Sequence, residues 1–355
     1  MTSTAERLKA APGETVRARG LPTGWGAAAL TVLAGSLLLG LSVGPVSTGV
    51  WAIASSAAAH LPFLHVHSRL DATDSAIVWQ LRAPRVMLAM LVGGMLAIAG
   101  SAYQGAFRNP LVDPYLLGTA AGAGLGATLA IAYAHASGGL LPVAAFAGAS
   151  VAVIAAYALG RSAGGIRGTG TLVLAGVTVT AFMTAVQTFV QQQHASTLQQ
   201  VYSFILGGFG SATWHDVLIA APYILVSSVV LILHRRVLDV LSLGDEEAAS
   251  LGIDVRRTRL IIVVAATIGT AAAVSVSGLI GFVGIIVPHS VRLLVSTSYR
   301  AIVPLALVLG GAFLVLADIL ARTVMSPAEL PIGVVTAFFG APFFAVVLRT
   351  TRRLG

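Results

Sequence analysis

The stretch RVMLAMLVGGMLAIAGSAYQG, residues 85–105, decides the fold class of this chain. After Arg85 it carries no charged side chain as far as Gly105. An α-helix rises about 1.5 Å per residue, so about 20 apolar residues cross the roughly 30 Å hydrocarbon core of a bilayer. The stretch therefore predicts a membrane-spanning helix.

The composition extends this prediction to the whole chain of 355 residues. Hydrophobic residues make up 57% of it and charged residues 10%, with a mean hydropathy of +0.91, whereas a soluble domain carries about 25% charged residues. We expect an all-α polytopic membrane protein, a compact bundle of about ten helices. The expected spans lie near residues 24–44, 85–105, 115–135, 142–160, 171–191, 217–234, 260–278, 281–296, 302–321 and 333–349. The eighth is short and contains Pro288, so it could be broken or partly buried.

Basic residues predict the orientation. If the N-terminus is cytoplasmic, seventeen of the 21 lysines and arginines lie inside and four lie outside, namely Arg69, Arg82, Arg85 and Arg322. The positive-inside rule favours this arrangement, with both termini inside and an even number of spans. We expect cytoplasmic tails at 1–23 and 351–355 around one permease domain at 24–350. The first apolar stretch is interpreted as a span and not as a cleaved signal peptide, because others follow it.

Glycines spaced four apart predict close contacts between helices. The pairs are Gly40 with Gly44, Gly118 with Gly122, and Gly122 with Gly126. Small residues at this spacing let helix backbones approach each other in lipid.

Missing residue types exclude several functions. The chain has no cysteine, and Lys9 is its only lysine, so no GxxxxGK[ST] phosphate loop exists in it. Neither HExxH nor GxSxG is present. The basic residues sit at the ends of apolar segments, which argues against nucleic-acid binding.

An ion-coupled carrier would keep ionisable residues in mid-membrane, but its candidates, Asp318 and His135, lie near expected helix ends. Energy is therefore expected from another subunit.

The segment LGDEEAASLG at 243–252 lies in the longest interior polar segment. Asp245 could cap a short surface helix at its N-terminus. The negative charges of Glu246 and Glu247 suit the positive end of that helix's dipole, and Gly252 suits the left-handed conformation that ends a helix. A solvated connector is the alternative.

Four further motifs follow in order: RAPR at 82–85, RNPLVDPYLLG at 108–118, GFVGIIVPHSVR at 281–292 and AELPIGVVTAFFGAPFF at 328–344. With LGDEEAASLG, they resemble the FecCD-type permeases, the membrane subunits of type II ABC importers for vitamin B12, haem and ferric siderophores. The resemblance covers nearly the whole chain from about residue 24.

The resemblance implies a pair of permeases, most simply a homodimer, with two ATPase subunits inside and a periplasmic or lipoprotein binding protein outside. ATP and magnesium would belong to the ATPase, and this chain would bind no cofactor or metal and catalyse no reaction. The ATPase would dock on the coupling loop, residues 235–259. Its expected contacts are Leu243, Gly244, Asp245, Glu246, Glu247, Ser250, Leu251 and Gly252. Positive-inside anchoring is the alternative for Arg256, Arg257 and Arg259, which flank this segment.

On the outer face, the resemblance assigns Arg82, Arg85 and Arg322 to docking of acidic groups on the binding protein. Charge-assisted pairs would set register and speed docking. Snorkelling to the membrane interface is the alternative.

Gln187 and Gln191 lie four apart in the fifth span, which lines the translocation path in the resembling family. They are candidate path residues, with hydrogen bonding between helices as the alternative. His65 and His67 are a weak metal signal in an outer loop, and His289 is expected to be structural or gating. The expected function is import of an iron chelate, a ferric siderophore or haem, across a bacterial cytoplasmic membrane. A corrinoid is the alternative.

Overall fold

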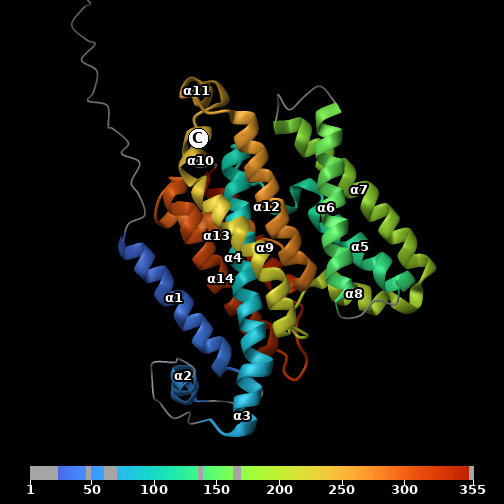
Figure 1. The fold of residues 1–355 in the computed structure, drawn as a ribbon, viewed down its shortest axis with the longest axis vertical. Coiled ribbons are helices and arrows are strands. Elements are labelled where there is room, and N and C mark those ends of the chain that lie inside the picture. Colours follow the sequence, from blue (N-terminus) through green and yellow to red (C-terminus); the bar gives the residue numbers. More distant parts are fainter. Residues whose placement is uncertain (1–22, 45–48, 60–69, 135–138, 163–168, 352–355) are drawn as a thin grey trace, which may run out of the picture.

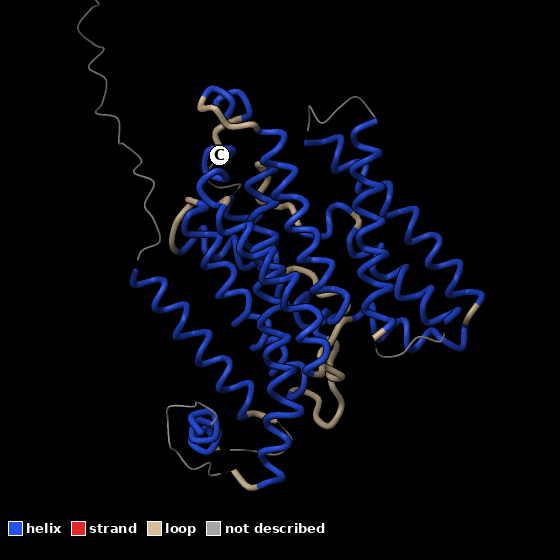
Figure 2. The backbone as a smooth tube through the Cα atoms, viewed as in Figure 1, coloured by secondary structure: helices blue, strands red, loops and turns tan. Residues whose placement is uncertain are grey.

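The computed structural model describes residues 23–44, 49–59, 70–134, 139–162 and 169–351. All regular secondary structure in these ranges is helical (Figure 2). His65, His67, His135 and nearly all of the expected tails lie outside the described residues. The predicted all-α membrane fold is confirmed.

Each of the ten expected spans corresponds to an apolar helix. They are α1 Thr23–Ser42, α4 Ala83–Phe107, α5 Thr119–Ala134, α6 Leu140–Ser162, α7 Thr169–Gln193, α9 Trp214–Leu233, α12 Val255–Ser277, α13 Val283–Leu294, α14 Tyr299–Thr323 and α15 Ile332–Thr351. Seven of the helices in the described ranges are long and apolar enough to cross a membrane, and α5, α13 and the apolar part of α15 are shorter.

Short helices connect the spans. They are α2 Val50–Ala59, α3 Ala72–Ala76, the π-helical turn η2 Ile77–Arg82, η3 Pro114–Leu117, η4 Ala195–Thr197, α8 Leu198–Leu206, α10 Arg235–Leu241 and α11 Asp245–Ser250. Together α3, η2 and α4 form one helix from Ala72 to Phe107. The eighth span is short and largely buried but unbroken, since α13 continues through Pro288.

The long helix α4 is the centre of the bundle (Figure 1). It packs against α9, α12, α13 and α14, and α1 packs on α14. Helices α5, α6 and α7 pack together on one side, and α12 joins them to the rest by contacting α6 as well as α4. Helix α11 lies at one end of the bundle, and α2 and α3 lie at the opposite end (Figure 1).

Glycine contacts explain how tightly α5 and α6 pack. A Cβ on Gly122 would collide with the carbonyl oxygen of Gly148, and one on Gly126 with that of Ala144. Removing side chains at these points lets the two backbones touch, as predicted for this pair. The prediction for Gly118 was wrong, because it ends η3 outside any span, with a φ of 83° that glycine adopts without strain.

Candidate functional site

Residues 243–252 form an exposed helical corner at the end of the bundle that is expected to be cytoplasmic. Leu243 and Leu251, on either side of α11, are each 65% exposed, and Glu246 and Glu247 are exposed as well. Ala248 is fully buried and holds the corner against the bundle. Both leucines and both glutamates are therefore accessible at this corner.

Asp245 has a different role from the one predicted. Gly244 is the N-cap of α11, without a side-chain hydrogen bond, so the capping prediction was wrong. Instead, Asp245 Oδ1 accepts a hydrogen bond from Arg259 Nη2 of α12 at 2.9 Å. Arg259 Nε also donates to the carbonyl oxygen of Ala106 in the last turn of α4, at 3.0 Å. The corner is thereby fastened to α4 and α12. Gly252 has a φ of 81°, as its predicted left-handed position requires.

A second attachment joins α10 to α14. Ser298, the N-cap of α14, donates from its hydroxyl to Asp239 Oδ2 at 2.7 Å, and Arg300 Nε lies 3.5 Å from the same oxygen. Nothing in the sequence pointed to Asp239, because a lone aspartate in a polar segment carries no signal of its distant partner.

At the outer end, Arg85 is the centre of a group of charges that we name the outer charge cluster: Arg82, Arg85, Asp318, Arg322 and Glu329. Arg85 Nε donates to Asp318 Oδ1 at 2.9 Å. Its two terminal nitrogens donate to Glu329, at 2.7 Å and 3.0 Å. Asp318 also lies 3.5 Å from Arg322 Nε, one helical turn further along α14.

The other two arginines hold the end of α1. Arg82 Nη1 donates to the carbonyl oxygens of Leu41 and Ser42, at 2.9 Å and 3.1 Å. Arg322 Nη2 donates to the carbonyl oxygen of Gly40 at 2.6 Å. Both arginines are buried, so they satisfy carbonyl groups that the last turn of a helix leaves unpaired.

Glu329 is the most exposed residue of the outer charge cluster. Its side chain is 45% exposed, against 1% for Asp318 and 11% for Arg85. Hydrogen bonding from Arg85 lowers the pKa of Glu329. The three arginines gather at this end of the bundle, but Asp318 and Glu329 already pair with Arg85. Their docking to a binding protein stays a prediction. The i, i+4 spacing of Asp318 and Arg322 was the available signal for this cluster.

Asp318 is not an isolated charge within the membrane, because the guanidinium groups of Arg85 and Arg322 neutralise it. In the part of the chain that the structure describes, no three His, Asp or Glu side chains gather into a possible metal site.

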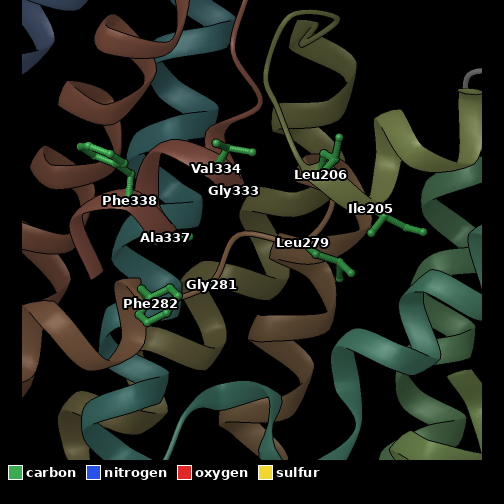
Figure 3. Close-up of a pocket in the computed structure, with 9 residues that line it drawn as sticks. All are labelled: Ile205, Leu206, Leu279, Gly281, Phe282, Gly333, Val334, Ala337 and Phe338. Atoms are coloured by element: carbon green, nitrogen blue, oxygen red, sulfur yellow. The ribbon is translucent and has the colours of Figure 1, made fainter. Parts of the chain in front are cut away.

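An apolar groove of about 550 Å³ lies between α8, the segment joining α12 to α13, and the start of α15 (Figure 3). Figure 3 shows Leu206 of α8, Leu279 before α13, and Val334 and Phe338 of α15 around it. Phe338 is 75% exposed. The groove has no charged lining residue.

The two predicted path residues do not line this groove. Gln187 is buried on α7 against α5, where a Cβ on Gly124 would come within 2.9 Å of its Oε1. Gln191 is half-buried. Burial of Gln187 favours a packing role within one subunit, and its lining of the path stays a prediction.

His289 packs its ring edge-on against Phe343 of α15, with centroids 5.9 Å apart. One turn later, Arg292 Nη2 lies 3.2 Å from Gln104 Oε1 of α4. The motif around His289 therefore connects α13 to α4 and α15, and its gating role stays a prediction.

These features define a multi-pass membrane protein whose sequence holds no GxxxxGK[ST] phosphate loop. The chain matches the FecCD transport family over residues 31–350 and belongs to that family. Two relatives are similar over most of their length. The cobalamin import system permease protein BtuC of Halobacterium salinarum is 37% identical, over 92% of this chain and 95% of that protein. The hemin transport system permease protein HmuU of Yersinia pestis is 38% identical, over 75% and 81%.

A solved metal-chelate type ABC transporter in an inward-facing conformation has a similar fold. Its TM-score is 0.81 at 27% sequence identity, covering 93% of this chain and 99% of that one. The chain is thus an ABC importer permease of the FecCD family, and the resemblance found in its motifs is confirmed.

Proposed function

We propose that the chain imports a metal chelate across a bacterial cytoplasmic membrane as one of two identical permease subunits. Two ATPase subunits would bind ATP and magnesium and dock on α11, while a binding protein would deliver the chelate outside. The observation that carries this proposal is the exposed corner formed by Leu243, Glu246, Glu247 and Leu251, which Asp245 and Arg259 fasten to the spans. Force applied there would reach α4 and α12 directly.

Exposed apolar side chains support pairing with a second copy. Phe182 of α7 and Phe338 of α15 are 68% and 75% exposed, and the apolar groove lies at the start of α15. A second permease placed against these faces would cover them and enclose a shared path. Lipid would contact the remaining apolar surface.

An iron chelate, either a ferric siderophore or haem, is the proposed cargo. The relative in Yersinia pestis is named as a hemin permease, which supports it. A corrinoid is the second candidate, because the cobalamin permease of Halobacterium salinarum aligns with 92% of this chain.

The test is uptake into proteoliposomes that contain the permease, its ATPase and its binding protein. We expect uptake only with magnesium, ATP and binding protein present, since this chain lacks a phosphate loop. Ferric siderophore, haem and cobalamin are supplied in parallel to identify the cargo. Uptake by the permease alone under a proton or sodium gradient would refute the proposal in favour of an ion-coupled carrier.

A further inference from the structure

A second cavity lies at the inner end of the bundle, and we name it the inner pocket. Its volume is about 720 Å³, and it is enclosed by the end of α6, the start of α7, α11 and the start of α12. It is separate from the apolar groove, which lies beside the start of α15. Its lining includes Asp245 and Arg259, the pair that fastens α11 to the spans.

The inner pocket has an apolar part and a basic part. Leu172 of α7 and Val263 of α12 are buried members of its wall, and Leu260 is partly exposed. Arg161, in the last turn of α6, and Arg256, in the first turn of α12, supply the basic part. Apolar groups next to cations at the membrane surface match an amphipathic anion.

The pocket's two carboxylates are already satisfied. Asp245 pairs with Arg259 at 2.9 Å, and Asp254 caps α12 by accepting from the backbone N–H of Arg257 at 2.9 Å. Arg161 and Arg256, by contrast, are exposed and make no hydrogen bond or ion pair with any residue that the structure describes. Arg256 also lies at the positive end of α12, where a cation is unfavourable and an anion favourable.

We propose that the inner pocket binds an anionic phospholipid of the inner leaflet. The headgroup phosphate would accept hydrogen bonds from the planar guanidiniums of Arg161 and Arg256. An acyl chain would lie along Leu172, Leu260 and Val263. Basic pockets between spans on the cytoplasmic side are suited to anionic headgroups, and a free phosphate would leave this apolar wall uncovered. Helix α12 joins the group formed by α5, α6 and α7 to the rest of the bundle. The lipid would bridge α6 and α12 at this junction.

The test is native mass spectrometry of the purified full-length permease in a non-ionic detergent, titrated with phosphatidylglycerol or with phosphatidylcholine of the same acyl chains. We expect one phosphatidylglycerol to be retained in preference to phosphatidylcholine. The double substitution Arg161→Gln with Arg256→Gln should weaken the binding of phosphatidylglycerol by about 10- to 30-fold. The lysine pair, Arg161→Lys with Arg256→Lys, keeps the charge and should retain most of the binding.

The matched control is Arg236→Gln with Arg257→Gln. It removes the same charge from exposed arginines of the same membrane face that do not line the pocket. An equal loss in this control would refute the proposal, because binding would then follow net charge alone. Displacement of phosphatidylglycerol by millimolar inorganic phosphate would also refute it and identify a soluble-anion site. The assay needs neither ATPase nor binding protein, so its result is independent of the proposed transport function.

Discussion

Replacing Asp318 with asparagine removes the negative charge that two buried guanidiniums share. Its side chain is 1% exposed, 2.9 Å from Arg85 and 3.5 Å from Arg322. The Asp318→Asn variant leaves both cations without that carboxylate, in a site from which water is excluded. Glu329 still pairs with Arg85 in this variant, so the buried cation left without a carboxylate is Arg322. Breaking a buried ion pair by removing one partner costs about 3–5 kcal/mol, because the remaining charge is then buried and uncompensated.

Glu329 provides a matched control, because it contacts the same Arg85 from the surface. Its side chain is 45% exposed, and exposed pairs contribute about 0–1 kcal/mol. The free energy of unfolding is measured for Asp318→Asn and Glu329→Gln by titrating detergent-solubilised permease with dodecyl sulfate. We expect a loss of about 3–5 kcal/mol for the first variant and at most about 1 kcal/mol for the second. Equal losses would refute the view that Asp318 is an ionised, buried anchor.

Two further predictions concern the two faces of the membrane. Reversing both acidic residues of α11, Glu246→Arg with Glu247→Arg, should leave the permease folded but separate ATP hydrolysis from uptake in the reconstituted importer, since both side chains face outward from the corner. Normal ATP-driven uptake in that variant would count against docking at α11. On the outer face, Glu329→Gln removes the carboxylate that competes for Arg85. We expect this variant to bind the binding protein several-fold more tightly at low salt. The gain should disappear at 1 M salt, where charges are screened. Weaker association at low salt would mean that Glu329 itself supports docking.

The sequence predicted the positions of the spans because a bilayer imposes a length and a composition on each one separately. Residues 85–105 are an example: lipid alone requires them to be helical, whatever their neighbours are. The exposed acidic corner at 243–252 was also visible locally, and so was its terminating Gly252. Where the local prediction was wrong, as for Asp245, the competing partner was Arg259, on the helix that follows.

Within the outer charge cluster, only the i, i+4 pair of Asp318 and Arg322 was visible in the sequence. Arg85 and Glu329 are 244 positions apart. They meet because α4 packs against α14 and the segment after α14 folds back, with Leu330 N–H donating to the carbonyl oxygen of Ala321. The inner pocket depends on the same kind of information, since its walls come from four helices. By itself, the sequence determined which segments enter the membrane, because hydropathy acts residue by residue. Which charges neutralise each other and which remain unpaired was decided by tertiary structure, because electrostatic pairing depends on distances in space and not along the chain.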